Sequence, residues 1–189
     1  MLSHTELKKG VQIVFEGSPY EIFESSSMFK GRGSSVTQTR MRNLENGNIL
    51  KRTFHAGEEV EEAEIQRFKA RFIYANKRKF VFSYMDDSSK RFELTEEQIG
   101  EVHHFLKENE VVEGLVFKDE VINVSLPVKT QLKVTEAPPG VKGDRAQGGT
   151  KTVTLETGAI INVPLFIDTG DIVEVNTETG EYTRRIQEE

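Results

Sequence analysis

The stretch YEIFESSSMFKGRGSSVTQTRMR, residues 20–42, reads as two β-strands joined by a glycine-rich turn. Strand-like sequence lies on both sides of a centre made of glycine, serine and two cations, Lys30 and Arg32. Because glycine adopts positive φ at no steric cost, Gly31 and Gly33 suit a tight, exposed bend. Such a hairpin tip has no apolar side chain to bury. We therefore expect Arg32 to point outward, either in an ordinary surface turn or as a probe for a partner.

Further strand signals surround this hairpin. The segment 10–15 alternates between apolar and polar residues, and residues 16–19 form a turn before Tyr20. Asn46-Gly47 marks a tight turn ahead of a strand over 49–54. Several short strands joined by hairpins within about 60 residues indicate a small barrel. We assign this barrel to residues 1–64.

Residues 65–127 repeat the pattern with aromatic side chains, which alternate on both sides of a turn at 75–78. Because they are interleaved with cations, these rings suit base stacking on an oligonucleotide-binding sheet. At a period of two they also suit one face of a core, which is the interpretation we favour. The aromatic residues are Phe68, Phe72, Tyr74, Phe80, Phe82 and Tyr84.

One short helix interrupts these strands. Thr95-Glu96-Glu97-Gln98 forms a capping box, and apolar residues at helical spacing follow it. We predict that the helix ends near Asn109 and that further strands cover 111–117 and 120–126.

Residues 128–189 form a third block of closely spaced strands and turns, with a long polar loop over 137–149. This pattern suggests another small barrel. Hydrophobic residues make up 36% of the chain and charged residues 30%, which is polar for a single large core. We therefore predict an all-β chain of three small β-barrels, over 1–64, 65–127 and 128–189.

The chain carries a net charge of −6, but its cations are segregated. From residue 28 to residue 55 it has six cations and one carboxylate, Glu45, so the local charge is +5. A second run, 67–91, has eight cations and two carboxylates. Such runs are usually solvated faces, but this segregation also suits an elongated protein with one side against RNA phosphates. The cations that we assign to RNA are Arg40, Arg42, Lys51 and Arg52.

Enzymatic chemistry has little support in the sequence. There is no cysteine, and Ser34 and Ser35 lack a visible general base. His103 and His104 are adjacent on the predicted helix, so their side chains should diverge by about 100° and not share a metal. We expect no catalytic residue, metal or cofactor. We also expect a cytoplasmic protein, because neither a signal peptide nor a stretch of transmembrane length is present.

Several motifs of this chain occur in the order and at the distances that are typical of one family. Gly31-Arg32-Gly33 at the hairpin tip is followed by RMRNL at 40–44. The last block contains PGVKGD at 139–144, TGAIINVPLFI at 157–167 and TGEYTRR at 179–185. Together these motifs resemble bacterial elongation factor P over essentially the whole chain.

This resemblance implies an SH3-like barrel followed by two oligonucleotide-binding (OB)-fold-like barrels, in an elongated L that mimics the outline of a tRNA. It implies a non-enzymatic translation factor that binds the 70S ribosome between the peptidyl and exit sites. Such a factor relieves stalling at consecutive prolines, with its hairpin tip beside the peptidyl-tRNA at the peptidyl-transferase centre. The implied partners are ribosomal RNA, ribosomal proteins, peptidyl-tRNA and mRNA. We expect a monomer and no membrane partner.

The resemblance also assigns roles at the tip. Alignment on the glycines puts Arg32 at the position that the family modifies after translation, and Lys30 where proline often lies. Arg32 is therefore the candidate for rhamnosylation by an arginine-modifying glycosyltransferase, and an unmodified Arg32 is the alternative. The neighbours of Arg32 at the tip are Lys30, Gly31, Gly33 and Ser34.

The loop of the last block departs from the family pattern, Gly-Asp-x-x-Gly-Thr, which lies near the exit-site codon. Gly143-Asp144 is kept, but Gln147-Gly148 replaces Gly-Thr. The candidates for ribosome or mRNA contact in this block are Gly143, Asp144, Arg145, Tyr182 and Arg185. Two alternative functions stay open: a paralogous factor with another stalling-motif preference, and a single-stranded RNA-binding module that uses the aromatic residues of 68–84.

Overall fold

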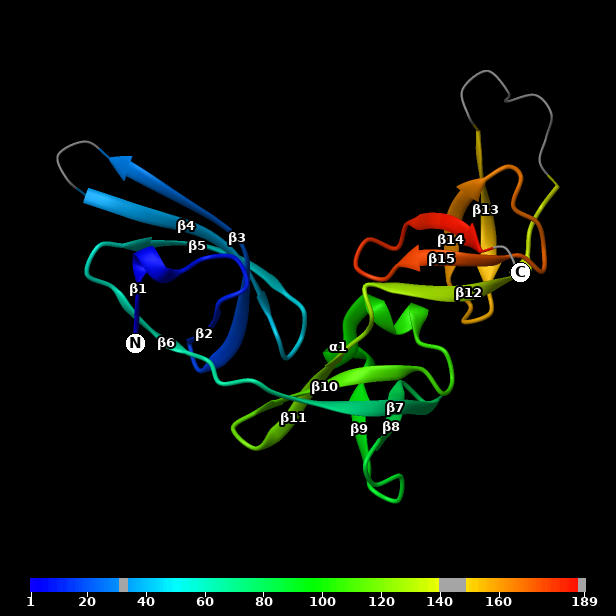
Figure 1. Cartoon of the computed structure of the whole chain (residues 1–189), viewed down its shortest axis with the longest axis horizontal. Helices are drawn as coiled ribbons and strands as arrows, with labels where there is room; N and C mark the ends of the chain where they lie inside the picture. The colour runs from blue at the N-terminus through cyan, green and yellow to red at the C-terminus, as the bar shows by residue number, and fades with distance from the viewer. Residues whose placement is uncertain (31–33, 140–148, 187–189) are drawn as a thin grey trace.

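The computed structural model describes residues 1–30, 34–139 and 149–186, and of Lys30 and Ser34 it describes the backbone alone. In these residues the strands form three antiparallel sheets, which follow one another along the chain (Figure 1). The predicted all-β class with three small units is confirmed.

The first sheet has the strand order β1–β6–β2–β3–β4–β5. Its strands are β1 (Leu2–Ser3), β2 (Gln12–Phe15), β3 (Ser18–Lys30), β4 (Ser34–Asn43), β5 (Ile49–His55) and β6 (Glu59–Glu62). A short 3-10 helix, η1 (His4–Glu6), follows β1. The β3–β4 hairpin confirms the first prediction made from the sequence. The core of the first sheet consists of Leu7, Ile13, Ile22, Met41, Phe54 and Val60.

The second sheet has the order β11–β10–β7–β8–β9. Its strands are β7 (Gln66–Asn76), β8 (Lys79–Tyr84), β9 (Arg91–Thr95), β10 (Val111–Phe117) and β11 (Glu120–Ser125). Phe72, Phe80 and Phe82 are at most 7% exposed and form its core, so the core interpretation is confirmed. The base-stacking interpretation is wrong for these three rings, which are buried in the core, whereas Tyr74 is 41% exposed and is not part of this core. The ring of Phe68 covers Gly114, where a Cβ would lie only 2.3 Å from it.

The helical segment is shorter than predicted. The capping box is present, with the Thr95 hydroxyl accepting from the Gln98 N–H, and it starts α1 (Glu96–Ile99). Gly100 adopts a φ of 69° and ends the α-helix there, and the chain continues as a 3-10 helix, η2 (Gly100–Phe105). The prediction of a helix to Asn109 is therefore wrong, because the left-handed conformation at Gly100 interrupts the α-helical hydrogen bonding.

The third sheet has the order β14–β13–β12–β15–β16. Its strands are β12 (Lys129–Glu136), β13 (Thr150–Leu155), β14 (Ile160–Pro164), β15 (Ile172–Asn176) and β16 (Tyr182–Ile186). Alternate residues of these strands point to one side and form a core of branched aliphatic side chains. Phe105 belongs to this core although it lies on η2, beside the second sheet.

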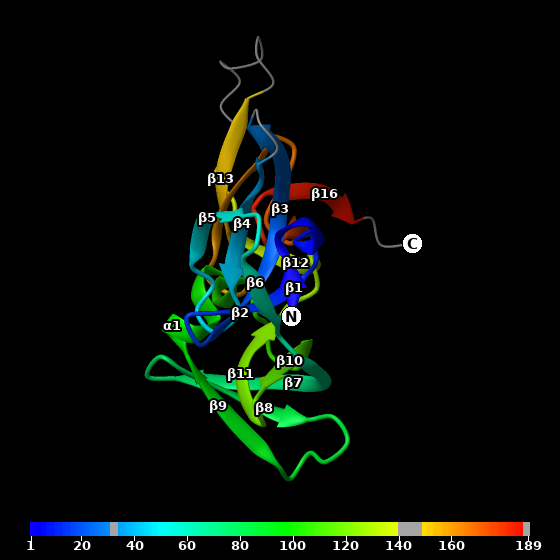
Figure 2. The same ribbon diagram turned by 90° about the vertical axis from the view of Figure 1, so that its left-hand side faces the viewer.

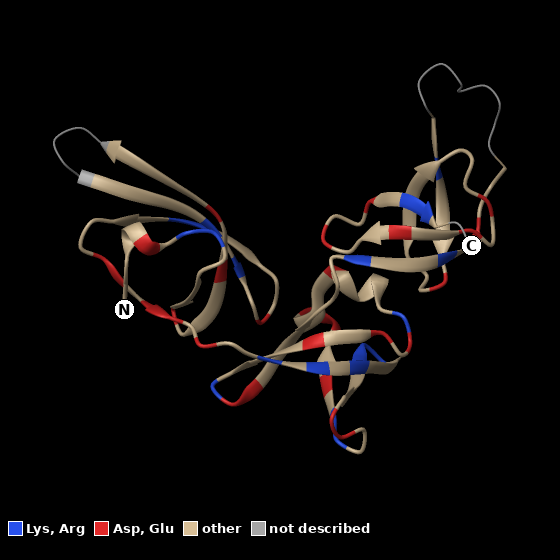
Figure 3. Cartoon of the chain, in the orientation of Figure 1, with Lys and Arg blue, Asp and Glu red and all other residues tan. Residues whose placement is uncertain are grey.

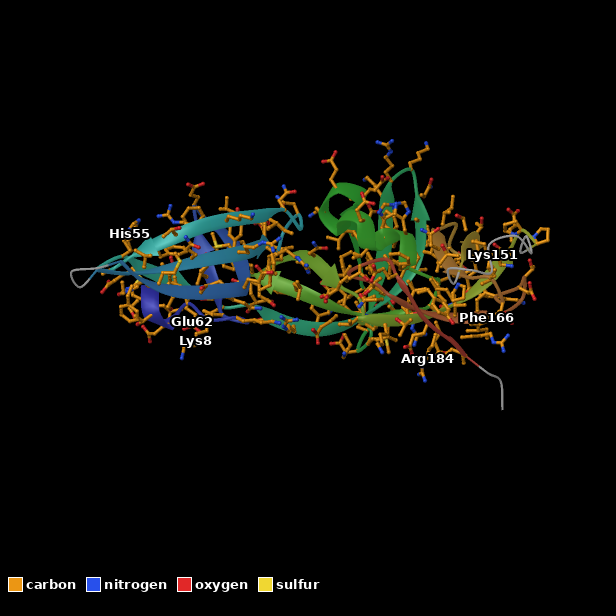
Figure 4. The ribbon with its side chains drawn as sticks, turned by 90° about the horizontal axis from the view of Figure 1, so that it is seen from above. Lys8, His55, Glu62, Lys151, Phe166 and Arg184 are labelled. Atoms are coloured by element: carbon orange, nitrogen blue, oxygen red, sulfur yellow. The ribbon has the colours of Figure 1, made fainter. Side chains whose placement is uncertain are left out.

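The three sheets form an open V with the second sheet at its vertex (Figure 1). Turned by 90°, the first and third sheets overlap above the second (Figure 2). From above, the molecule is long, with His55 toward one end and Lys151 and Phe166 toward the other (Figure 4). This agrees with the elongated, bent arrangement expected from the resemblance.

Both joints of the V are packed with apolar side chains. At the first joint, Leu44 and Ala63 of the first unit form one cluster with Leu115, Phe117 and Ile122 of the second. At the second joint, Phe105 inserts among the core residues of the third sheet and is 8% exposed. The arms of the V are therefore attached through buried contacts as well as through the chain.

Candidate functional site

The β3–β4 hairpin extends past the end of its sheet. β5 ends at His55, opposite Val36, whereas the hairpin continues through the pairs Phe29–Ser35 and Lys30–Ser34. The predicted tip residues Gly31, Arg32 and Gly33 lie outside the described residues, as do the side chains of Lys30 and Ser34. The candidate for modification is thus on the segment that joins the two ends of this extension.

Two exposed apolar side chains lie close to this end, beside a tip that was expected to have no apolar side chain to bury. Phe29 is 87% exposed and Met28 is 39% exposed. Large exposed apolar side chains at the end of a hairpin are typical of contact surfaces. The sequence carries a signal for this feature, since both residues directly precede Lys30.

The hairpin is held by contacts with η1 and the segment that follows it, one near its tip and one further down β3. The imidazole Nε2 of the buried His4 is 2.7 Å from the Ser35 hydroxyl, and the Ser25 hydroxyl donates to the carbonyl of Leu7. Thr37 and Thr39 on the same face of β4 are each 2% exposed. These contacts restrict the motion of the hairpin relative to its barrel.

The four cations assigned to RNA do not share one face. Paired residues of an antiparallel sheet point to the same side, and successive residues alternate. The register pairs Arg40 with Lys51, and Arg42 with Ile49, on the outer face of β4 and β5. Arg52 pairs with Thr39, so it points to the opposite face. The structure therefore brings together Arg40, Arg42 and Lys51 and separates Arg52 from them.

The outer-face arginines are held by contacts with β3. The guanidinium carbons of Arg40 and Arg42 lie 5.1 and 5.7 Å from the ring centre of Phe23, within cation–π range. Arg40 also donates to both carboxylate oxygens of Glu24, at 2.9 and 3.1 Å. Arg42 approaches Glu178 of the third unit at 3.9 Å. Phe23 takes this position because the register of β3 shifts between Ile22 and Glu24.

Arg52 is engaged on the other face. Its guanidinium lies 4.7 Å from the ring centre of Phe15 and 4.9 Å from that of Phe54, and it is 3.0 Å from Glu58. The pKa of Glu58 is lowered, mainly by the hydrogen bond that the His55 N–H donates to it and further by Arg52. These contacts stabilise the end of β5.

A wide, shallow groove crosses the hairpin and β5. The charged residues along it are Lys9, Glu24, Arg40, Lys51 and Arg52. Because the guanidinium of Arg52 lies on the opposite face beside Glu58, the remaining three cations and one carboxylate give the groove a charge of +2 in a chain of net charge −6. Serine, threonine and glutamine residues line the remainder beside Phe23. This groove can accept the backbone of a polyanion.

The candidates on the third unit are only partly described. Gly143, Asp144 and Arg145 lie outside the described residues. Tyr182 packs against the third core, and Arg185 lies 3.7 Å from Asp171 and 5.6 Å from the ring centre of the exposed Phe166. The structure thus holds Tyr182 and Arg185 on β16 by contacts within their own unit.

Lys151 is a buried cation of the third unit that its sequence does not single out. Its side chain is 6% exposed, and its Nζ donates to the carbonyl oxygen of Pro138 at 3.0 Å (Figure 4). Asp168 lies 3.5 Å from the same nitrogen. Lys151 therefore ties the end of β12 to the start of β13. Sequence offers no signal for this contact, because a lysine on a strand is usually exposed.

The two adjacent histidines do not diverge as predicted. The ring centres of His103 and His104 are 3.9 Å apart, and His103 Nδ1 is 2.7 Å from the carbonyl oxygen of Gly100. The prediction assumed α-helical geometry, and this segment is a 3-10 helix. In the part of the chain that the structure describes, no group of three or more acidic or histidine residues is placed to hold a metal. No helix there is long and apolar enough to cross a membrane.

Comparison with known families matches three family models in succession. Residues 3–60 match the model described as the elongation factor P KOW-like domain, and residues 65–124 match the elongation factor P OB domain. Residues 130–185 match the model of the elongation factor P C-terminal region.

Curated relatives match over the full length. Elongation factor P of Carboxydothermus hydrogenoformans is 38% identical over 186 residues, which is 98% of this chain and all of the relative. Elongation factor P of Natranaerobius thermophilus is 39% identical, and all of each chain is covered. Among solved structures, translation initiation factor 5A from Methanococcus jannaschii matches 66% of this chain and 91% of its own, with a TM-score of 0.51 and 17% identity. That likeness concerns the fold.

Proposed function

The chain belongs to the elongation factor P family, and we propose that it binds the 70S ribosome between the peptidyl and exit sites. There it stimulates peptide-bond formation and relieves stalling at consecutive prolines. The β3–β4 hairpin extends toward the peptidyl-transferase centre, with Arg32 beside the acceptor end of the peptidyl-tRNA. The observation that carries this proposal is the hairpin that continues past its sheet and is held in this extension by the contact of His4 with Ser35.

The proposed mechanism needs no catalytic group in the protein. Proline reacts slowly in peptide-bond formation because its ring restricts backbone geometry. A factor that holds the peptidyl-tRNA in a reactive geometry raises the rate, because it removes the entropy cost of alignment. Ribosomal RNA then carries out the chemistry, and no metal or cofactor of the protein takes part.

The charge of the hairpin supports contact with RNA. Arg40, Arg42 and Lys51 lie on one face, and the groove there has a charge of +2. Phosphate contacts of this kind fix orientation without reading sequence. Figure 3 shows acidic residues on the remaining units, which limit indiscriminate RNA binding. We assign Arg52 a role in holding β5, because Glu58 and two aromatic rings engage it on the other face.

The remaining assignments follow from the family. Tyr182 and Arg185, with Gly143, Asp144 and Arg145, are proposed for contact with ribosomal components or mRNA on the exit side. Arg32 is proposed as the site of rhamnosylation by a glycosyltransferase of the host. The protein is proposed to act as a cytoplasmic monomer. Intact-mass measurement of protein from its native host tests the modification directly.

Reconstituted translation of a message that encodes consecutive prolines tests the function. The wild-type protein should relieve the stall, and Arg32→Ala should lose most of this relief. Arg32→Ala should change the free energy of unfolding by no more than about 0.5 kcal/mol, as exposed substitutions do. Lys133→Ala, which removes one exposed cation from β12, is the matched control and should keep full relief.

Two results would contradict the proposal. Absence of any effect of the suitably modified wild-type protein on the proline stall would exclude the function. A large loss of thermal stability in Arg32→Ala would show that Arg32 is structural. Relief of other stalling motifs but not of consecutive prolines, seen by ribosome profiling after deletion, would identify a paralogous factor.

A further inference from the structure

Two arginines of the second sheet differ from the other arginines that the structure describes. Arg71 on β7 and Arg91 on β9 are exposed and lie within 4.0 Å of no described carboxylate. Each of the remaining described arginines has a carboxylate partner within that distance: Arg40, Arg42, Arg52, Arg67, Arg78, Arg184 and Arg185. In a chain of net charge −6, unpaired arginines require an explanation.

The register brings these two arginines to one place. Ser83 on β8 pairs with Arg71 on one side and with Arg91 on the other. All three side chains therefore point to the same face, opposite the face on which Phe72 and Phe82 form the core. Adjacent strands lie about 4.8 Å apart, so the two arginine Cα atoms are separated by about 10 Å. Both guanidinium groups can reach a point above Ser83.

The burial of Ser83 agrees with this geometry. Ser83 is only 4% exposed although it lies on the outer face. Arginine side chains lay their apolar stems along neighbouring surface and keep their charged ends in water. The register puts Arg71 and Arg91 on either side of Ser83, so we infer that their stems cover this residue.

Two neighbouring cations without an anion repel each other. Like charges on neighbouring positions of a sheet destabilise it, and an anion bound between them removes this cost. The nearby carboxylates are already engaged: Glu93 accepts from Lys79 at 3.2 Å, and Glu113 accepts from Arg67 at 2.7 Å. The pair therefore keeps its capacity for an external anion.

We propose that Arg71 and Arg91 form a second anion site, which binds a phosphate group of an RNA backbone on the outer face of the second sheet. The planar guanidinium group donates two parallel hydrogen bonds to phosphate oxygens, a geometry that lysine cannot reproduce. The choice of RNA phosphate over a protein carboxylate rests on the proposed function, which brings the chain against ribosomal RNA. Basic residues recur along β7 in Figure 3. Lys69 lies on the same face as Arg71, but its ammonium group is already 3.8 Å from Glu113.

Fluorescence anisotropy with a labelled RNA duplex tests the site without ribosomes. Wild-type protein is compared with Arg71→Ala/Arg91→Ala and with Arg71→Lys/Arg91→Lys, at about 50 mM and about 200 mM salt. The matched control is Lys77→Asn/Arg78→Asn, which removes two cations from the β7–β8 turn of the same sheet. Asparagine tolerates the positive φ at these positions, 49° and 63°, so the turn is kept.

The alanine pair should bind about tenfold more weakly at low salt, as expected for loss of one charge-assisted bidentate contact. The slope of log K against log salt should become shallower by about 0.9, the value for one phosphate of a duplex. The lysine pair should keep most of this slope and still bind more weakly. The asparagine control should stay within about twofold of wild type, because these two cations lie in the turn and not beside Ser83, and Arg78 is already paired with Glu96 at 3.6 Å. Thermal melting of each variant confirms that it is folded.

Three outcomes would contradict the proposed anion site. They are absence of duplex binding by the wild-type protein at low salt, a lysine pair that binds the duplex like wild type, and a loss of duplex affinity in the asparagine control equal to that of the alanine pair. Tighter binding of a labelled oligo-glutamate peptide than of RNA, through the same two arginines, would assign the face to a protein partner instead. A parallel binding assay with vacant 70S ribosomes separates the proposal of the anion site from the proposed function. If the wild-type protein binds the duplex but not the ribosome, the proposed function fails and the site stands.

Discussion

Phe105→Ala tests how the second and third units are joined. Phe105 lies on η2 but packs in the core of the third sheet, where it is 8% exposed. Truncation of a buried phenylalanine to alanine costs about 3–5 kcal/mol of unfolding free energy. We expect a value near the lower end, about 3 kcal/mol, because the two units can shift toward each other and reduce the cavity.

Differential scanning calorimetry measures this change and shows which part of the chain unfolds. If the third unit melts on its own, its Tm should fall by about 12–24 °C, since one kcal/mol moves a small domain by about 4–8 °C. If the whole chain unfolds together, the fall should be about 6–12 °C, because a larger unit shifts less. The size of the shift therefore reports the cooperativity across the joint.

Phe166→Ala is the matched control, because it makes the same substitution in the third unit at a residue that is 59% exposed. Its cost should be within about 1 kcal/mol, mostly from the lost contact with Arg185. Equal Tm shifts for the two variants would refute our reasoning, because they would mean that Phe105 contributes no more than a surface ring.

Three further predictions concern single contacts. Glu24→Gln should release Arg40 and raise ribosome affinity at low salt, measured by filter binding, while stability changes by less than about 1 kcal/mol; unchanged affinity would show that Arg40 does not contact RNA. Gly114→Ala should destabilise the second sheet by about 1–3 kcal/mol in urea unfolding, because a Cβ would clash with the ring that covers it; wild-type stability would contradict this packing. The pKa of Glu174 is lowered from its ordinary value of 4.5, mainly by the hydrogen bond from Arg184. The ionised Glu174 therefore stabilises the folded protein at pH values above 4.5, and this contribution is lost as the pH falls through the lowered pKa. Glu174→Gln should therefore flatten the fall in Tm as the pH drops below 4.5, and a variant that keeps the wild-type fall would exclude this contribution.

Local patterns predicted most of the strands. The β3–β4 hairpin was predictable because glycine and the alternation of side chains act within a few residues. The aromatic residues of 68–84 were assigned to the core for the same reason. The premature end of α1 had a local signal as well, since Gly100 follows the last apolar residue of the first turn, a common helix ending.

The arrangement of the candidate site was less predictable because it depends on register. The sequence places Arg40, Arg42, Lys51 and Arg52 in one basic run, but the pairing of β4 with β5 puts Arg52 on the opposite face. A shift of one residue in that pairing would exchange the two faces. The irregularity at Phe23 and the buried contacts of Lys151 depend on tertiary structure, which a single sequence does not contain.

The contact between Arg42 and Glu178 turns the V into a closed ring of contacts. The first unit is joined to the second by the Leu44 cluster, the second to the third by Phe105, and the third back to the first by this ion pair. Three bodies in an open chain can rotate at either joint independently, whereas in a closed ring one joint cannot rotate unless another contact changes. Because an exposed ion pair contributes no more than about 1 kcal/mol and is screened by salt, it is the link that breaks first. Salt concentration should therefore control the span between the two arms, while both buried joints stay intact.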